Sequence, residues 1–331
     1  MTGVSRANGG RPPAAEMGDF FVCDFFGVSP KHDLASMEHP VFSLSTRPDR
    51  RILTYDRGGV EVTVTPSVKG RATIFDADIL IFCISQLMAA LNRGAPVSRH
   101  LTLTAHDLLL ATHRETSGDA YRRLREAFER LAGTRITTNI ATGEGDGLTE
   151  TTTGFGLIEA WEIVRKTRKG RMVSVSVTLS DWLYRAVLAK SVLTLSRDYF
   201  TLRRPLERRL YALARKHCGA QPRWQVSVAT LAEKSGSRSP RRVFRAMLRE
   251  IIAEDRLPDY RLDEMPGDLI RVTPRRTRAK GGALDPETLE AARAAVPGAD
   301  VYALEARWRA ATGGGGGDAA FLDWVTAEAR I

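Results

Sequence analysis

The sequence predicts an α+β protein in which one order of helices and strands occurs twice, followed by a small helical tail. From residue 75 to 164 the apolar spacing predicts helix, strand, helix, helix, strand, loop and strand, and this order recurs from 205 to 273. A constant shift of 123 residues pairs six apolar positions of the two segments, among them Leu101 with Trp224, Leu108 with Leu231 and Phe128 with Ile251. Because this is the order of a winged helix, a helix-turn-helix with a β-wing, we predict tandem winged-helix domains.

The excess positive charge is concentrated in the second half of the chain. There are 49 Lys and Arg against 39 Asp and Glu, which gives a formal net charge of +10. Between Arg197 and Arg278 there are 20 Lys and Arg against 10 Asp and Glu, so this region accounts for the whole excess. A basic domain on a neutral body indicates a nucleic-acid partner rather than an anionic membrane.

Cysteine usage and hydropathy argue against several classes of protein. Cys23, Cys83 and Cys218 are far apart and form no CxxC pair, which disfavours a disulfide framework or a zinc knuckle. No apolar segment near the start resembles a secretion signal, and no run approaches the ~18 apolar residues that a membrane span needs. We therefore expect a cytoplasmic protein without a membrane partner.

The first half begins with a low-complexity segment. Residues 1–18 are rich in Gly, Pro, Ala and Arg and lack an apolar period, so we expect them to be disordered. Residues 51–65 alternate apolar and polar side chains around two glycines, which predicts a β-hairpin. The aromatic residues between these segments are expected to pack on the first domain: Phe20, Phe21, Phe25, Phe26 and Phe42.

The remaining elements of the first repeat follow from its apolar spacing. Two strands, 135–140 and 155–164, are predicted to flank a glycine-rich tip at 143–147. The alternating valines of 172–179 predict a strand that joins the two repeats together with a helix at 180–190. The other elements are helices at 75–92, 106–112 and 118–132 and a strand at 101–103. The candidates for a dimer surface are Ile79, Leu80, Phe82, Leu87 and the hairpin Val60–Val64.

The second repeat ends in a short wing and a basic linker. Strands at 259–262 and 269–273 flank the turn Met265-Pro266-Gly267-Asp268, and the linker follows at 275–282. The helices of this repeat are predicted at 205–218, 228–234 and 239–254, with a strand at 224–226. Tail helices are predicted at 286–295, 301–311 and 320–329, with a flexible break at 313–317.

The helix at 239–254 carries the most specific binding signal. Ser239 and Pro240 read as its N-cap and first helical residue. Its apolar residues take one side of the helix, and guanidinium groups lie within roughly 100° of arc on the other. Those arginines are Arg238, Arg241, Arg242, Arg245 and Arg249. Five like charges on one face need either solvent or a polyanion, and the basic surroundings favour the polyanion.

Catalytic and metal-binding patterns are largely missing. The six histidines include no pair separated by one residue, and His106 and His113 form only a weak two-ligand candidate. No phosphate-binding GxxxxGK[ST] and no activated serine or cysteine nucleophile is found. His217 and Cys218 suggest the end of a helix rather than a redox pair. We therefore expect no enzyme activity, no cofactor and no metal.

Several long stretches resemble the plasmid replication initiator protein A family, over roughly residues 19–273. Among them are MEHPVFSLS at 37–45, ATIFDADILIFCISQLM at 72–88, LTAHDLLLATHR at 103–114, YRRLREAFERLAGTRITTNI at 121–140, VTLSDWLYRAVL at 177–188, DYFTLRRPLERRLYALARKHCG at 198–219 and LPDYRL at 257–262. The resemblance implies two winged-helix domains, binding to repeated sites (iterons) in double-stranded origin DNA, and initiation of replication with host machinery.

The resemblance also implies a division of the chain. The tail at 1–18 would precede an N-terminal winged-helix domain at 19–196, which dimerises and makes accessory DNA contacts. A C-terminal winged-helix domain at 197–274 would carry the main origin-DNA binding, and 275–331 would be the linker and helical tail. The DNA-binding candidates are Arg238, Ser239, Arg241, Arg242, Arg245 and Arg249 on the reading helix, Lys234 before it, Arg271, Arg275 and Arg276 beside the wing, and Arg122, Arg123 and Arg125 on the equivalent first helix.

The partners that the resemblance implies are origin DNA, the host replication initiator and the replicative helicase or its loader. A homodimer in equilibrium with monomer, repression of its own promoter as the dimer, and association with the plasmid or nucleoid are also expected. The alternatives are a winged-helix transcriptional regulator without a replication role and a scaffold that does not bind DNA.

Overall fold

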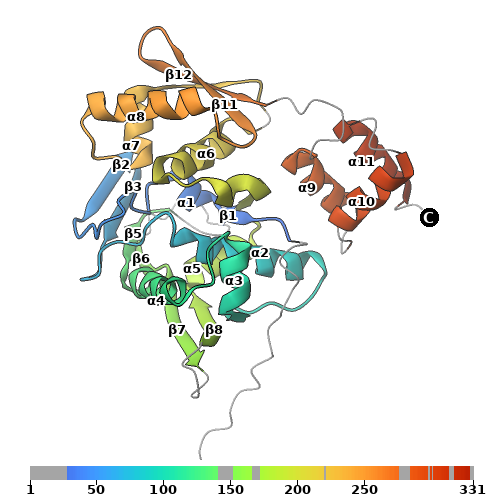
Figure 1. The fold of residues 1–331 in the computed structure, drawn as a ribbon, viewed down its shortest axis with the longest axis horizontal. Coiled ribbons are helices and arrows are strands. Elements are labelled where there is room, and N and C mark those ends of the chain that lie inside the picture. Colours follow the sequence, from blue (N-terminus) through green and yellow to red (C-terminus); the bar gives the residue numbers. More distant parts are fainter. Residues whose placement is uncertain are drawn as a thin grey trace, which may run out of the picture.

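A computed structural model describes residues 28–140, 152–165, 172–219, 221–275, 284–296, 299, 301–312 and 317–328. The predictions for residues 1–18, for the aromatic residues at 20–26, for the glycine-rich tip and for the linker from Arg276 onward lie outside these residues. Figure 1 shows two units of helices and sheet stacked on each other, with the tail helices beside them.

The first unit is organised around a helix that is buried on all sides. Helix α2 (Ala77–Asn92) is apolar around its whole circumference, and 13 of its 16 residues are buried. After it come β4 (His100–Thr104), α3 (Ala105–Ala111) and α4 (Gly118–Gly133), and then the strands β7 (Ile158–Arg165) and β8 (Met172–Leu179). The sheet has the order β4-β8-β7 and is antiparallel throughout. The strand expected to join the repeats is therefore the central strand of this sheet.

A second sheet, with the order β2-β3-β5-β6, is added to the first unit. The predicted hairpin forms β2 (Leu53–Arg57) and β3 (Val60–Thr65), and the glycines of its turn, Gly58 and Gly59, have positive φ. Strands β5 (Arg135–Thr138) and β6 (Thr153–Gly156) complete the sheet.

The single strand predicted at 155–164 was wrong, because it is divided between the two sheets of the first unit. The change of sheet occurs at Gly156, where a Cβ atom would lie 3.0 Å from the Ile158 carbonyl oxygen. Glycine allows this close approach of the backbone, so β6 ends there and β7 begins in the other sheet.

The second unit repeats the order and the strand pairing of the first. Helix α6 (Pro205–His217) precedes β10 (Trp224–Ser227), α7 (Val228–Ser235), α8 (Arg241–Glu254), β11 (Tyr260–Met265) and β12 (Leu269–Pro274). The sheet order is β10-β12-β11, again with the last strand in the centre. Helices α7 and α8 each begin 123 residues after α3 and α4, which confirms the predicted shift for these elements.

Short elements connect the two units, and of these the sequence predicted the helix at 180–190 but not the others. Strand β1 (Lys31–Asp33) pairs with β9 (Val192–Thr194), and helix α1 (Leu34–Glu38) follows β1. Helix α5 (Asp181–Leu188) and the 3-10 helix η2 (Arg197–Thr201) lie between the units in sequence. Phe42 is buried in the core of the first unit, as predicted.

The tail helices share an apolar core of their own. Helices α9 (Pro286–Ala295), α10 (Val301–Thr312) and α11 (Gly317–Glu328) pack around Trp308, Phe321 and Val325. Glu290 of α9 pairs with the buried Lys31, and Glu287 lies 3.3 Å from the Arg215 guanidinium. These contacts hold the tail against β1 and α6.

Buried charged groups lock the two units together. Asp78 of α2 forms ion pairs with Arg208 of α6 at 2.5 Å and with Arg114 at 3.1 Å. Asp78 and Arg208 are at most 2% exposed. Arg209, also buried, donates to the carbonyl oxygens of Ser36 and Met37 at 2.9 Å each and to further carbonyl groups. Because a buried charge without partners is very costly, this junction has one preferred arrangement.

The residues expected to form a dimer surface are instead core residues. Ile79, Leu80, Phe82 and Leu87 are at most 4% exposed, and Val62 and Val64 are at most 2% exposed. Their apolar character is explained by packing within one chain. Among the described residues, no helix combines the length and the apolar character needed to cross a lipid bilayer.

Candidate nucleic-acid interface

Helix α8 presents a basic face because its apolar face is used to build the core. Phe244, Leu248 and Ile251 are at most 3% exposed and pack in the core of the second unit. The opposite side lies at the outer edge of the molecule, beside β11 and β12 (Figure 1). Four arginines and Ala246 line one shallow concavity there: Arg241, Arg242, Arg245 and Arg249. The structure therefore brings these four predicted residues together.

The start of α8 differs from the prediction. Pro240 occupies the N-cap position, the helix begins at Arg241, and no side chain caps it. The predicted cap from Ser239 was therefore wrong; proline carries no hydrogen-bonding side chain, and the Ser239 amide instead donates to the Ser237 hydroxyl at 3.4 Å. The uncapped first amides remain available to an anion. Arg238 precedes the helix and donates to the Ile52 carbonyl oxygen of the first unit at 3.3 Å.

The arginines of this face differ in their partners. In the part of the chain that the structure describes, Arg241 and Arg242 are exposed and have neither an ion pair nor a hydrogen bond. Arg245 pairs with Asp268 in the turn between β11 and β12. Arg249 binds both carboxylate oxygens of Glu264, at 2.7 and 2.9 Å. Half of the basic face thus carries counter-ions supplied by the neighbouring hairpin.

These ion pairs also shift the ionisation of their members. Hydrogen bonds from Arg249 lower the pKa of Glu264, and the same bonds raise the pKa of Arg249. Both groups stay ionised around neutral pH, so an incoming phosphate has to compete with a charged carboxylate.

Two other predicted contacts have structural roles. Lys234 is only 9% exposed and its ammonium group pairs with Glu38, so it does not reach the basic face. Arg275 binds the backbone carbonyl oxygen of Asp255 at 2.8 Å and its carboxylate at 2.6 Å, which closes the C-terminal end of α8. In the free protein a phosphate would have to displace this carboxylate from Arg275, so its predicted phosphate contact stays a prediction.

The last residues predicted beside the wing are Arg271 and Arg276. Arg271 is half-buried on the central strand β12, opposite Gln225 and Asp263, and its Nε is buried without a hydrogen-bond partner among the described atoms. Arg276 lies outside the described residues.

The three arginines predicted on the first unit lie on α4 and are largely neutralised. Arg122 and Arg123 both pair with Asp119, and Arg125 lies 3.3 Å from Glu129. Their side chains are 53 to 70% exposed. Since each cation has a carboxylate three or four residues away, α4 offers far less free charge than α8.

Comparison with known proteins places these features in a family. Residues 31–262 match the family described as Replication initiator protein A. The chain belongs to the Replication initiator protein A family. The match covers both repeated units up to β11, and the tail helices lie beyond it.

One relative and one solved structure illustrate what this initiator family member is similar to. A protein of Wigglesworthia glossinidia brevipalpis named "Putative replication protein" is 37% identical over 248 residues, which are 74% of this chain and 88% of that protein. The crystal structure of domains 2 and 3 of RctB superposes with a TM-score of 0.52, at 14% identity, over 72% of this chain and 96% of that chain. The second likeness concerns the fold alone.

Sequence reasoning on this family member missed a basic cluster at the junction of the units. A cavity of about 770 Å³ is lined by residues far apart in sequence, including Arg47, Lys69, Arg71, Arg123 and Arg203. The segments Arg47-Pro48-Asp49-Arg50-Arg51 and Lys69-Gly70-Arg71 carry a local signal, since each places basic residues in a loop beside Pro or Gly. Their convergence with Arg203 depends on the packing of the two units.

No described group of three or more His, Cys, Asp or Glu side chains is arranged to hold a metal ion. His106 is exposed, and its Nδ1 lies 3.5 Å from Asp107. His217 lies at the end of α6, with Nε2 2.8 Å from Glu38, and stacks on Trp224 at 4.7 Å between ring centroids. Cys218 is buried and its thiol pKa is raised by burial, which disfavours a redox role.

Proposed function

We propose that this protein is a replication initiator that binds repeated sequences in double-stranded origin DNA. The observation that carries the proposal concerns the exposed guanidinium groups of Arg241 and Arg242 at the start of α8, which have no partner among the described residues, in a member of the Replication initiator protein A family. Arginine binds guanine edges in the major groove through two parallel hydrogen bonds, and a helix N-terminus favours phosphate.

The repeated arrangement supports two winged-helix domains within this proposal. Each unit has a three-stranded sheet and three helices. The first helix comes before the first strand, and the other two lie between the first and second strands in sequence. The last two strands form a hairpin, and the third helix lies on the surface. We propose that α8 reads the major groove and that the β11–β12 hairpin is its wing. The proposed division of the chain remains 19–196, 197–274 and 275–331, with α4 making accessory backbone contacts.

Assembly is a separate part of the proposal. Recruitment of a host initiator and of the replicative helicase or its loader follows from an initiator role, as does a homodimer that represses its own promoter. The dimer requires a surface other than the buried residues of α2 and β3. The exposed apolar residues Ile52 and Val68 of the first unit, 57% and 82% exposed, are better placed for it. The protein is further proposed to act by binding, without nuclease activity.

The decisive experiment is footprinting of the purified protein on the origin region of its own replicon. We expect protection of repeated sites, and Arg242→Ala should cost about 1–3 kcal/mol at one or two base positions. Arg185→Ala, a change of an exposed arginine on α5, is the control. Protection of random sequence to the same degree, or an unchanged preference in Arg242→Ala, would contradict the reading helix. Metal-dependent nicking by the pure protein would contradict the binding-only role.

A transcriptional regulator without a replication role is the alternative function. A plasmid carrying only the origin, with the protein supplied in trans, separates the two. Replication that depends on the protein and is lost in the double variant Arg241→Ala, Arg242→Ala supports the initiator. Promoter repression without replication would support the regulator.

A further inference from the structure

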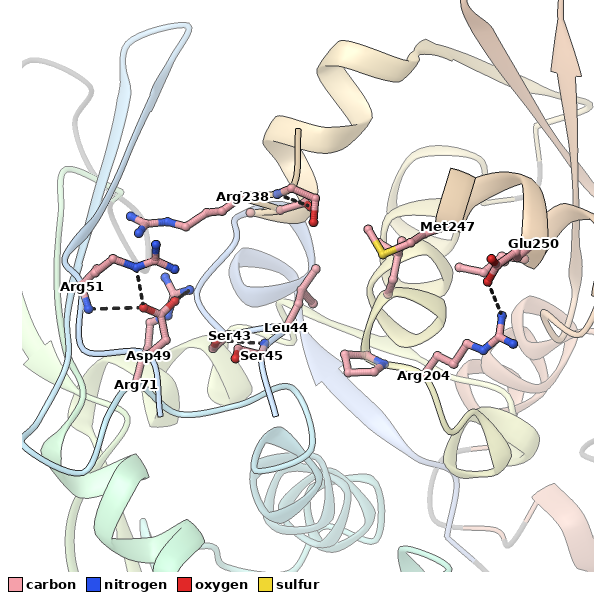
Figure 2. A pocket seen from close by; sticks show the side chains of 16 residues that line it. Ser43, Leu44, Ser45, Asp49, Arg51, Arg71, Arg204, Arg238, Met247 and Glu250 are labelled. Atoms are coloured by element: carbon pink, nitrogen blue, oxygen red, sulfur yellow. Dashed lines mark hydrogen bonds and ion pairs between the residues drawn. The ribbon is translucent and has the colours of Figure 1, made fainter. Parts of the chain in front are cut away.

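A cavity of about 580 Å³ lies where the start of α8 meets the first unit. One wall comes from the loop that contains Ser43, Ser45, Asp49 and Arg51, together with Arg71. The other wall comes from residues 236–239 before α8, from α8 itself and from the start of α6. Figure 2 shows that Arg51, Arg71 and Arg238 gather at one end of this cavity, around Asp49. The site is thus composed of both units.

The charges at this end of the cavity do not balance. Asp49 accepts from the Arg51 Nε at 3.1 Å and from the Arg71 Nη2 at 3.3 Å. Arg238 approaches from the second unit and is anchored by its bond to the Ile52 carbonyl oxygen. Three guanidinium groups therefore share one carboxylate. Guanidinium groups that gather around one carboxylate repel one another, and an added anion would reduce that repulsion.

Arg71 is the buried member of the three, whereas Arg51 and Arg238 are exposed. Its side chain is 2% exposed, and its Nε and Nη1 have no hydrogen-bond partner among the described atoms. Burial, followed by the nearby charges of Arg238 and Arg51, lowers the pKa of Arg71 despite the opposing effect of Asp49. Buried donors without acceptors are rare in folded proteins, and each costs about 1–3 kcal/mol. An oxyanion among these arginines would supply the missing acceptors.

The surroundings extend the positive charge towards the first unit. Arg71 and Ser45 also line the neighbouring cavity that contains Arg47, Lys69 and Arg203. The Arg51 side chain is 66% exposed, so this member of the cluster is accessible from solvent. The second cavity leads from Arg71 towards Arg123 of α4, and its lining contains the carboxylates of Asp76, Glu115 and Glu126 beside its more numerous basic residues.

We propose that Arg51, Arg71 and Arg238 form a phosphate-binding site at the junction of the two units. Guanidinium groups bind phosphate oxygens through paired, charge-assisted hydrogen bonds. A phosphate therefore suits a cluster of three guanidinium groups better than a single carboxylate does. The phosphate can belong to the backbone of bound DNA, in which case the inference rests on the proposed function. It can also belong to a free polyphosphate or nucleotide, which requires no DNA binding.

The experiment uses the full chain and the exposed members of the cluster, because replacing the buried Arg71 could unfold the protein. Arg51→Gln and Arg238→Gln are compared with Arg185→Gln, which removes an exposed arginine paired with Asp181 at 3.1 Å, the same separation as in Arg51–Asp49. Affinity for a repeat duplex and for an unrelated duplex is measured over a range of salt concentrations. Thermal unfolding is measured with and without millimolar tripolyphosphate.

If the phosphate comes from DNA, Arg51→Gln and Arg238→Gln each weaken both duplexes about threefold to tenfold, and the slope of log K against log salt flattens by about 0.9. If it is free, tripolyphosphate raises the melting temperature of the wild type and of Arg185→Gln but not of the other two variants. Wild-type affinity in both variants, together with equal responses to tripolyphosphate, overturns the site. Failure of the wild type to bind any duplex counts against the proposed function and leaves the tripolyphosphate result to decide the site.

Discussion

At the scale of single residues, α8 combines free and neutralised arginines in one concavity. Arg241 and Arg242 have no partner in the described part of the chain, whereas Arg245 and Arg249 are paired with Asp268 and Glu264. A phosphate gains the full attraction of the first two but has to displace a carboxylate from the others. Non-specific binding should therefore be weaker than a count of arginines suggests.

Replacing Glu264 should show how far its carboxylate weakens DNA binding by neutralising Arg249. Glu264→Gln frees the Arg249 guanidinium, so we expect tighter binding to an unrelated duplex and a slope of log K against log salt that is steeper by about 0.9. Fluorescence anisotropy at several salt concentrations measures both. Glu159→Gln, which breaks the 2.8 Å pair with Arg99 on the first unit, is the control for a change in net charge alone. An unchanged slope in Glu264→Gln would mean that Arg249 lies outside the interface.

A buried histidine should make the fold sensitive to acid. His39 is 8% exposed, and its Nδ1 has no hydrogen-bond partner among the described atoms. Burial lowers its pKa from 6.5 to about 4, with Arg209 and Lys234 acting in the same direction against Glu38. Between these two values the unfolded chain binds a proton that the folded chain does not, so the free energy of unfolding falls as the pH falls.

His39→Gln should therefore reduce the loss of stability on acidification. Between about pH 7 and pH 5 we expect the free energy of unfolding to fall by about 2 kcal/mol less than in the wild type. Urea denaturation at the two pH values measures this, and His106→Gln, at an exposed position, is the control. Equal losses in wild type and His39→Gln would show that other groups cause the acid sensitivity.

At the scale of elements, α8 is held at its C-terminal end by Arg275, the residue that follows β12. Asp255 has a φ of 48°, in the left-handed region, and Arg275 binds its carbonyl oxygen and carboxylate and the Leu257 carbonyl oxygen at 3.1 Å. This contact joins the end of strand β12 to the C-terminal end of α8.

Arg275→Ala should consequently destabilise the fold without changing the salt dependence of DNA binding. Several charge-assisted hydrogen bonds at a partly exposed site suggest a loss of about 1–2 kcal/mol in the free energy of unfolding. Chemical denaturation measures the loss. Arg256→Ala is the control, because that side chain is 70% exposed and makes one 3.4 Å contact with Glu254. A flatter salt slope with unchanged stability would instead support the phosphate contact that the sequence predicted for Arg275.

Local signals explain which elements were predictable. Thr104 and Ser227 cap α3 and α7 at equivalent positions, and such caps can be read from sequence. Strand pairing could not be read in the same way, because β8 pairs not only with its neighbour β7 but also with β4, which lies far away in the sequence. The arginine face of α8 followed from helical periodicity. Its neutralisation by Asp268 and Glu264, and the cluster of Arg51, Arg71 and Arg238, depend on tertiary packing.

At the scale of the whole molecule, the Asp78 carboxylate is the centre of the ion pairs that join the two units. This carboxylate is 1% exposed and receives two guanidinium groups, one of them from the second unit. Removing it would leave Arg208, itself 2% exposed, as a buried cation without its counter-ion. The cost of breaking such a pair exceeds the gain from forming it.

Asp78→Asn should lower the free energy of unfolding by about 3–5 kcal/mol and uncouple the two units. Chemical denaturation followed by both fluorescence and circular dichroism should then give transitions that no longer coincide. Asp181→Asn, which breaks an exposed pair with Arg185, should leave one cooperative transition. A single unchanged transition in Asp78→Asn would show that the junction is held by other contacts.

The locked junction has a consequence for the DNA that such a protein can recognise. Because the buried ion pairs fix α4 relative to α8, a molecule that contacts DNA through both helices, as proposed, would require one particular spacing between its two contact points on the duplex. Each inserted base pair would move the second contact point by roughly 3.4 Å and rotate it by roughly 35° around the helix axis. A protein with a flexible hinge could adapt to that change in spacing, whereas this one would lose one of its two DNA contacts. Spacing, as much as base sequence, would then define the site.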